Sequence, residues 1–262
     1  MTGRLRLSAT NISVKYGARR IVDGADLVLK AGELTILAGP NGAGKTTLAR
    51  AIAGLARFEG EVLLNGVSLS RLSPRDKARA LAYLPQGHQY HWPMPVRDIV
   101  ALGREPHADI FDRRSAADRA AIETALQMTG IESFMDRPIT TLSGGERARV
   151  ALARALATQA DVMIADEPIA SVDERHRLII MDLLRIVAHR GTAVLAIIHD
   201  LSLAMRFADR VALMQNGRIV ADDTPELVLT TERIAEIFGV TVERVQTSHG
   251  PALVPSHAIS QY

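Results

Sequence analysis

Apolar and polar residues alternate along two N-terminal segments of the chain, residues 5–14 and 21–29. A period of two with many branched side chains is typical of strands, and Gly17 and Gly32 end the two segments. Short apolar runs predict further strands, and these runs lie at residues 33–38, 61–65, 161–165, 192–198, 210–214 and 218–221. Helical periodicity between the later strands predicts parallel β-α-β units.

The middle of the chain has a different character. Residues 89–159 show helical periodicity, are rich in alanine and arginine, and contain prolines that break helices. We therefore expect an α/β core formed by residues 1–88 and 160–240, with an N-terminal antiparallel β subdomain, and a helical insert formed by residues 89–159. A short helix is expected at residues 231–238. The tail at residues 241–262 has no readable pattern.

Composition narrows the class of protein. The chain has 262 residues, 47% apolar and 23% charged, which suits a globular protein and not a disordered or fibrous one. It contains no cysteine, so disulfides and cysteine-ligated metals are excluded. The formal net charge is only +2, which gives no reason to expect nucleic acid as a partner. No apolar run approaches the roughly 20 residues of a membrane-spanning helix, so a membrane role requires a partner.

A glycine-rich segment joins the strand at residues 33–38 to a helix expected at about residues 44–55, and it matches the P-loop pattern. The segment and the threonine after it are Gly39, Pro40, Asn41, Gly42, Ala43, Gly44, Lys45, Thr46 and Thr47. Small residues let backbone N–H groups and the helix N-terminus face phosphate oxygens. Lys45 can reach the β- and γ-phosphates, and Thr46 can ligate Mg²⁺. A plain turn is the alternative, but the match in this context favours a phosphate site.

Two carboxylates follow the apolar strand at residues 161–165. Asp166 is placed to hold Mg²⁺, directly or through water, and Glu167 to orient or deprotonate an attacking water. An exposed turn closed by Pro168 explains the same residues equally well. His199 ends another apolar strand, where a structural histidine is the common case. Because ligands collect at the carboxyl ends of parallel strands, we expect His199 beside Glu167 and the γ-phosphate.

A second glycine motif, Leu-Ser-Gly-Gly-Glu at residues 142–146, precedes a long helix rich in alanine and arginine. Ser143 and Glu146 form the S-x-x-E pattern of a capping box, which accounts for the start of the helix. The box does not account for Gly144 and Gly145 in the first turn, where each glycine costs up to about 1 kcal/mol relative to alanine. Close approach of a phosphate to this helix N-terminus would explain both glycines.

These motifs, in this order, make the chain similar to the ABC ATPase family over nearly its whole length. Gln86 matches the Q-loop of that family, and Tyr16 matches the aromatic residue that stacks on adenine, although an ordinary strand aromatic is the alternative. The resemblance implies a P-loop NTPase core with an ABC-type helical insert, and hydrolysis of ATP with Mg²⁺. The catalytic residues that it implies are Lys45, Gln86, Glu167 and His199, and the metal ligands are Thr46, Gln86 and Asp166.

The resemblance also implies an assembly, a head-to-tail homodimer with two ATP molecules between the chains. Ser143, Gly144 and Gly145 of one chain would bind the γ-phosphate held by Lys45 of the other. Gln86 would link Mg²⁺ to the insert, which would grip integral-membrane permease subunits at the cytoplasmic face of a bacterial inner membrane.

The D-loop departs from the family pattern. It reads Ala-Ser-Val-Asp at residues 170–173, where the family usually has Ser-Ala-Leu-Asp, and Ile169 stands where threonine is common. Asp173 is retained, so we expect it to lie at the nucleotide site and hydrolysis to be intact.

Residues 96–104 and 227–239 resemble the ATPases of importers for ferric siderophores, haem and cobalamin. Such importers pair with a permease and a periplasmic or lipid-anchored binding protein. Both segments are equally compatible with the generic helices of any importer ATPase, so import of another solute, such as a metal ion, is an alternative function. A soluble ABC ATPase that acts on ribosomes or DNA is a second alternative. A small-molecule kinase is a third alternative, which the Leu-Ser-Gly-Gly-Glu motif disfavours. His88, His91 and His107 fit no standard zinc spacing, and we expect no metal beyond Mg²⁺.

Overall fold

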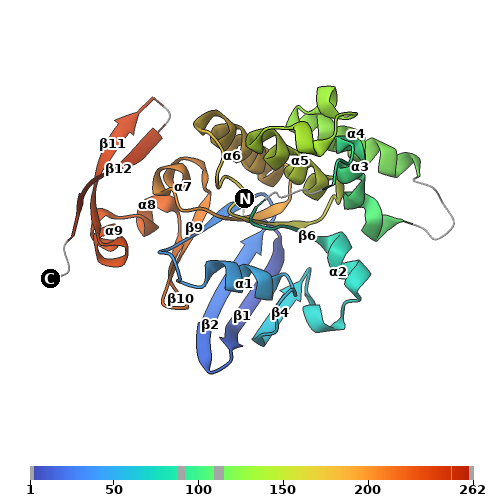
Figure 1. Ribbon diagram of the computed structural model, residues 1–262. Helices are drawn as coiled ribbons and strands as arrows, with labels where there is room; N and C mark the ends of the chain where they lie inside the picture. Colours follow the sequence, from blue (N-terminus) through green and yellow to red (C-terminus); the bar gives the residue numbers. More distant parts are fainter. Residues whose placement is uncertain (1–2, 88–91, 109–114, 249, 260–262) are drawn as a thin grey trace.

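The computed structural model describes residues 3–87, 92–108, 115–248 and 250–259. It has a mixed α/β fold with two main sheets, a cluster of helices on one side and a hairpin on the other (Figure 1). Within the described residues, no helix is both long enough and apolar enough to cross a membrane.

The central sheet contains six strands, namely β3 (Leu34–Ala38), β6 (Leu81–Leu84), β7 (Val162–Asp166), β8 (Ala193–Ile197), β9 (Arg210–Gln215) and β10 (Arg218–Asp223). Their order is β10-β9-β3-β8-β7-β6. Strands β9 to β6 pair in parallel, and β10 pairs with β9 antiparallel. In β3, Ile36 packs into the core on one face and Leu37 into the core on the other. Burial on both faces is the reason that these strands are apolar runs.

A second, antiparallel sheet is built from the N-terminal strands β1 (Leu5–Tyr16), β2 (Arg19–Lys30), β4 (Glu59–Leu64) and β5 (Val67–Ser68), in the order β2-β1-β4-β5. Helix α1 (Lys45–Ile52) packs its Leu48 and Ile52 into the same apolar core as β1 and β2. The antiparallel N-terminal subdomain predicted from alternation is therefore confirmed.

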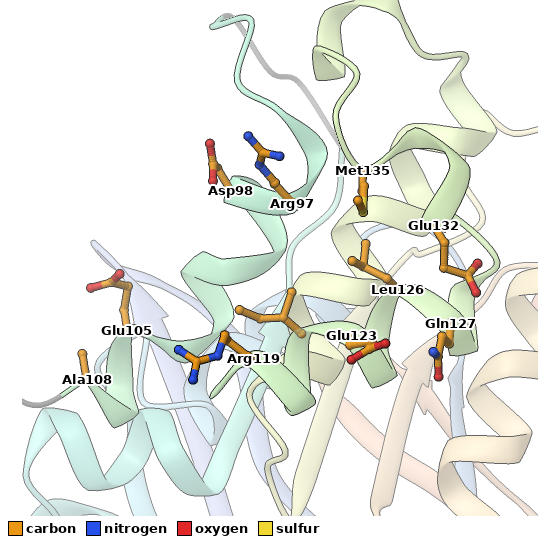
Figure 2. Close-up of a pocket in the computed structure, with 11 residues that line it drawn as sticks. Arg97, Asp98, Glu105, Ala108, Arg119, Glu123, Leu126, Gln127, Glu132 and Met135 are labelled. Carbon is orange, nitrogen blue, oxygen red and sulfur yellow. The ribbon is translucent and has the colours of Figure 1, made fainter. Parts of the chain in front are cut away.

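Short helices lie between the second sheet and the end of the predicted insert. They are η1 (Leu69–Arg71), α2 (Pro74–Ala80), α3 (Val96–Ala101), η2 (Leu102–His107), α4 (Ala116–Thr129), η3 (Glu132–Phe134), η4 (Ile139–Thr141) and α5 (Gly144–Ala157). Ile99, Leu126 and Val150 belong to an apolar core that α3, α4 and α5 share. A cavity of about 970 Å³ opens between α3, η2 and α4 (Figure 2). The limits of the insert at residues 89 and 159 stay a prediction.

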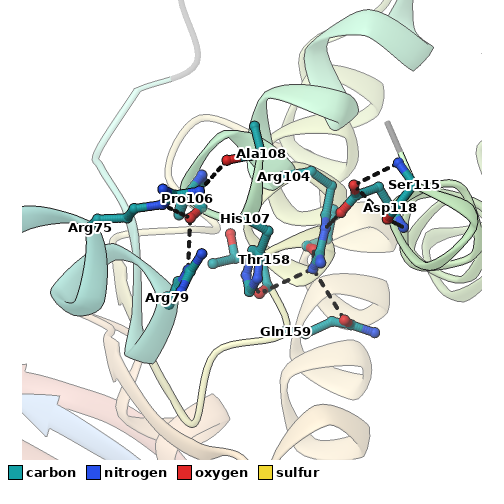
Figure 3. Close-up of polar contacts among 11 residues, drawn as sticks. Arg75, Arg79, Arg104, Pro106, His107, Ala108, Ser115, Asp118, Thr158 and Gln159 are labelled. Carbon is teal, nitrogen blue, oxygen red and sulfur yellow. Dashed lines mark hydrogen bonds and ion pairs between the residues drawn. The ribbon is translucent and has the colours of Figure 1, made fainter. Parts of the chain in front are cut away.

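Polar contacts join these helices to one another and to α2 (Figure 3). Arg79 of α2 donates to the Pro106 carbonyl at 2.8 Å. Arg104 of η2 donates to Asp118 at 2.8 Å and to the Ala157 carbonyl, in the last turn of α5, at 2.8 Å. Since Arg104 and Asp118 are both buried, this ion pair fixes η2 against α4 and α5.

The C-terminal third contains α6 (Glu174–His189), α7 (Leu201–Phe207), α8 (Pro225–Val228), α9 (Thr231–Phe238), β11 (Val240–Thr247) and β12 (Gly250–Ala258). Helix α9 confirms the helix predicted at residues 231–238. The tail without a readable pattern forms an antiparallel hairpin of β11 and β12, which packs on α7 and α9 (Figure 1). Val242 and Leu253 are its buried apolar residues, too few to produce a periodic pattern.

Candidate active site

Three loops meet at the carboxyl end of the central sheet. Gly39 follows β3, Asp166 ends β7, and His199 comes two residues after β8. Since β3, β8 and β7 are neighbours, their carboxyl ends converge, as the topology rule predicts. The cavity at this edge measures about 300 Å³ and is lined by Arg19, Ile21, Asn41, Gly42, Gly44, Lys45, Thr46, Thr47, Glu167 and His199.

The P-loop needs its glycines for close backbone approach. A Cβ at Gly39 would lie 2.1 Å from the Met214 carbonyl oxygen, and one at Gly44 would lie 2.8 Å from the Ile21 carbonyl oxygen. The buried ammonium of Lys45 donates to the carbonyl of Gly39 at 2.8 Å and to that of Pro40 at 2.9 Å. Burial lowers the pKa of Lys45, while Glu167 and Asp166 act in the opposite direction. The Lys45 ammonium can exchange these two carbonyl partners for the oxygens of a phosphate.

Asp166 is fully buried and hydrogen-bonded through both oxygens. The Thr46 hydroxyl donates to Oδ1 at 3.0 Å and the Tyr83 hydroxyl to Oδ2 at 2.8 Å. Burial and the Asp166 carboxylate raise the pKa of Tyr83, so Tyr83 stays a neutral donor. A hydroxyl oxygen beside a carboxylate is a donor set that suits Mg²⁺.

Glu167 is held by two side chains from different loops. Gln86 Nε2 donates to its Oε2 at 2.6 Å, and His199 Nε2 donates to its Oε1 at 2.7 Å. The Glu167 backbone has a φ of 50°, in the left-handed region that non-glycine residues seldom adopt. Such strain costs of order 1–3 kcal/mol and is common at functional sites. Each carboxylate oxygen keeps lone-pair capacity, so Glu167 can still accept a hydrogen bond from water.

The residues of the Leu-Ser-Gly-Gly-Glu motif lie at the start of α5 and do not line this cavity. The capping box is confirmed: the Ser143 hydroxyl accepts from Glu146 N at 3.2 Å, and the Glu146 carboxylate accepts from Ser143 N at 2.8 Å. A Cβ built on Gly144 would make only an ordinary van der Waals contact, 3.7 Å from the Ser171 carbonyl oxygen. A Cβ on Gly145 would instead lie 2.3 Å from Cγ of His176 in the same chain. Packing therefore already requires the second glycine, and a phosphate is not needed to explain it.

The predicted site residues Tyr16 and Asp173 do not line the cavity. Tyr16 is 55% exposed and pairs across the β1–β2 hairpin with Arg19, which does line the cavity. Asp173 caps α6, where its carboxylate accepts from His176 N at 2.9 Å. The sequence motifs gave no signal for Arg19, which lines the cavity, or for Tyr83, which donates to Asp166, because tertiary packing alone brings these residues to the site.

His88, His91 and His107 were the remaining histidines of interest in the sequence. His107 Nε2 is hydrogen-bonded to the Thr158 carbonyl at 2.9 Å, and His88 and His91 lie outside the described residues. In the part of the chain that the structure describes, no group of three His, Cys, Asp or Glu side chains could hold a metal ion.

A P-loop lysine and threonine that face two strand-end carboxylates define a nucleoside triphosphatase of the P-loop class. Residues 22–170 match the model of the ABC transporter family, and the chain belongs to that family. It is an ATP-binding subunit, which hydrolyses ATP to drive transport.

Relatives with known names cover most of the chain. A protein of Streptomyces coelicolor named hemin import ATP-binding protein HmuV is 41% identical over 92% of this chain and 86% of its own length. The petrobactin import ATP-binding protein FpuC of Bacillus anthracis is 34% identical over 95% of this chain and 92% of its own length. A solved chain of a metal-chelate type ABC transporter in an inward-facing conformation matches this chain with a TM-score of 0.84 at 23% identity. The match covers 97% of this chain and 98% of the solved chain, and it confirms the ABC ATPase fold.

Proposed function

We propose that the chain is the ATPase subunit of an importer for an iron chelate, a ferric siderophore or haem, or for cobalamin. Residues 96–104 and 227–239 resemble the ATPases of such importers, and the relatives above are named for import of hemin and petrobactin. The observation that carries the proposal is identity of 34% and 41% to these relatives over more than nine-tenths of the chain. Such a subunit works at the cytoplasmic face of a bacterial inner membrane with a permease and a solute-binding protein.

The phosphate end of ATP fits the P-loop cavity. Backbone N–H groups of residues 41–46 at the N-terminus of α1 would bind phosphate oxygens, and Lys45 would exchange its carbonyl partners for the β- and γ-phosphates. Thr46 and Asp166 would hold Mg²⁺, supported by their 3.0 Å contact, and Gln86 is a further candidate ligand. The ion supplies charge neutralisation on the phosphates. Tyr16 would stack on adenine beside Arg19.

Glu167 would orient and deprotonate the attacking water. Its carboxylate lines the same cavity as Lys45, and His199 holds one of its oxygens. A general base of this kind contributes typically 10²–10⁴-fold to the rate. His199 keeps Glu167 pointed at the γ-phosphate side of the cavity and supports the same step.

We expect the complete site to need two chains in a head-to-tail homodimer. Ser143, Gly144 and Gly145 lie away from the P-loop cavity of their own chain, and the space beside Gly144 is open to a ligand. A phosphate carried by a second chain suits this helix N-terminus, which the capping box leaves accessible at Gly144. Asp173 is the last residue of the D-loop, whose Ala170, Ser171 and Val172 line the same cavity as Gly144.

The permease would dock on the cavity of about 970 Å³ between α3, η2 and α4 (Figure 2). Ile122, Leu126 and Met135 give it apolar surface. Its charged lining residues are Asp98, Glu105, Glu123, Glu132, Arg97 and Arg119, an acidic excess in a chain with a net charge of +2. We therefore expect a short permease segment with an apolar face and basic flanks.

The first test compares ATP binding with hydrolysis. Glu167→Gln should bind ATP as tightly as wild type, form a dimer with ATP on size-exclusion chromatography with light scattering, and hydrolyse ATP at least about 100-fold more slowly. Lys45→Ala is the matched control and should lose ATP binding and dimer formation together. Near-normal turnover in Glu167→Gln contradicts the role given to Glu167.

The second test identifies the solute. A deletion strain should lose uptake of one of labelled haemin, ferric siderophore or cobalamin, and wild type but not Glu167→Gln should restore it. Unchanged uptake of all three overturns the proposed solute class and leaves the ATPase activity untouched. Purification with ribosomes or DNA in place of a permease favours a soluble ABC ATPase instead.

A further inference from the structure

His176, in the first turn of α6, lies directly against the N-terminus of α5. A Cβ built on Gly145 would be 2.3 Å from Cγ, 2.5 Å from Cδ2 and 2.6 Å from Nδ1 of the His176 ring. The side chain is only 12% exposed, although it sits at the start of a helix next to a loop. The ring therefore occupies a space that is open only because position 145 is glycine.

The same ring is tied to the end of the D-loop. His176 Nδ1 lies 2.9 Å from Oδ1 and 2.8 Å from Oδ2 of Asp173, and the backbone N–H of His176 donates to Oδ1 at 2.9 Å. Asp173 is thus fixed by three polar contacts to one residue. These hydrogen bonds lower the pKa of Asp173, which keeps the carboxylate ionised.

Together, these contacts join two segments that are nearly thirty residues apart in the sequence. The start of α5 and the D-loop border a common cavity of about 470 Å³, lined among others by Gln86, Gly144, Ala170 and Ser171. Ser171 has a φ of 60°, so the loop conformation is one that needs outside support. His176 packs behind this face, between Gly145 and Asp173.

We propose that His176 is a positioning residue that holds the α5 N-terminus and the D-loop at the spacing needed to meet the nucleotide of a second chain. The proposal rests on the head-to-tail dimer proposed above. Because the ring contacts Gly145 and Asp173 and not the P-loop cavity, His176 acts on dimer closure and turnover and not on binding of ATP to a single chain.

The test uses the full chain with Glu167→Gln, and measures the protein concentration at which ATP produces half-maximal dimer. His176→Ala should raise this concentration about tenfold or more, as expected for loss of a charge-assisted hydrogen bond, while monomer affinity for a fluorescent ATP analogue changes less than about twofold. In the otherwise wild-type chain, the same change should lower kcat with little effect on KM. His189→Ala, an exposed histidine of the same helix, is the control and should behave as the parent.

Two further variants separate positioning from folding. His176→Phe keeps a ring beside Gly145 but cannot donate to Asp173, so it should unfold at the same urea concentration as the parent and still dimerise poorly. His176→Asn keeps a donor near the position of Nδ1 and should recover much of the dimer. Parent-like dimerisation of both His176→Ala and His176→Phe overturns the inference. If Glu167→Gln itself forms no dimer with ATP, the proposed assembly fails and the inference fails with it.

Discussion

Replacement of Arg104 by alanine tests the account of how the helical segments are held together. Residues Arg104 and Asp118 are 7% and 6% exposed, and their 2.8 Å contact is supported by Ser115, which donates to the other oxygen of Asp118. Arg104 also donates to the carbonyl of Ala157 at 2.8 Å and to the side chain of Gln159 at 3.1 Å. Arg104→Ala leaves a buried carboxylate and a buried carbonyl without these donors.

The size of the effect follows from that environment. Removing one partner of a buried ion pair destabilises a protein by roughly 3–5 kcal/mol, because the remaining charge stays out of water without compensation. Native proteins are stable by only about 5–15 kcal/mol. For a chain of this length each kcal/mol lowers Tm by about 2–4 °C, so we expect a fall of roughly 6–20 °C.

Urea unfolding followed by circular dichroism measures the loss, and Arg97→Ala is the matched control. Arg97 pairs with Asp136 at the surface, where the side chains are 54% and 63% exposed, and such pairs contribute about 1 kcal/mol or less. The double variant Arg104→Ala with Asp118→Ala should lose less unfolding free energy than the sum of the two single variants, because it contains no unpaired buried charge. The reasoning is refuted if the unfolding free energy of Arg104→Ala lies within about 1 kcal/mol of that of Arg97→Ala.

Three further predictions concern the site and its supports. Gly145→Ala should lose about 1–3 kcal/mol by overpacking against His176, measured by urea unfolding, and Gly145→Ala with His176→Ala should recover part of it. Tyr83→Phe should lose about 1–3 kcal/mol because a buried Asp166 oxygen is left unpaired, whereas the exposed Tyr16→Phe should lose almost nothing. The hydrogen bond from Arg104 lowers the pKa of Asp118 below its ordinary 3.8, so this carboxylate stabilises the fold above about pH 4 and the contribution disappears as pH falls through the lowered value. The unfolding free energy of Asp118→Asn should consequently fall less between pH 5 and about pH 2.5 than that of wild type.

A structural feature can be predicted from the sequence when the residue types that form it have one dominant physical cause. A wholly apolar run such as residues 193–198 is typical of a strand that is buried on both faces, so β8 was predictable, and with it the position of His199 at the end of the sheet. The P-loop was predictable because its glycines are required by close backbone contacts, as at Gly39. The hairpin at the C-terminus was not, since Val242 and Leu253 provide its buried apolar surface and leave no period to detect.

Gly145 illustrates a different limit, because two causes predict the same residue. A phosphate at the α5 N-terminus and a histidine ring from α6 both exclude a Cβ there, and the sequence contains no information on which of them is near. Position 176 itself looks like an ordinary polar residue in the first turn of a helix. Its contact with Gly145 exists only once α5 and α6 pack together.

The hydrogen bonds of Glu167 connect the proposed catalytic carboxylate with the segment that follows β6. The family resemblance implies that Gln86 links Mg²⁺ to the insert, and in this structure its amide donates to Glu167 Oε2 at 2.6 Å. Gln86 comes two residues after the end of β6, and α3, which borders the 970 Å³ cavity, begins only ten residues after it. If a bound permease moved α3 and withdrew Gln86, Oε2 would lose this donor while His199 still donated to Oε1. Under the role proposed for Glu167, the lone pairs that its carboxylate offers to water would then depend on the position of α3, and a partner bound to the helices would affect hydrolysis.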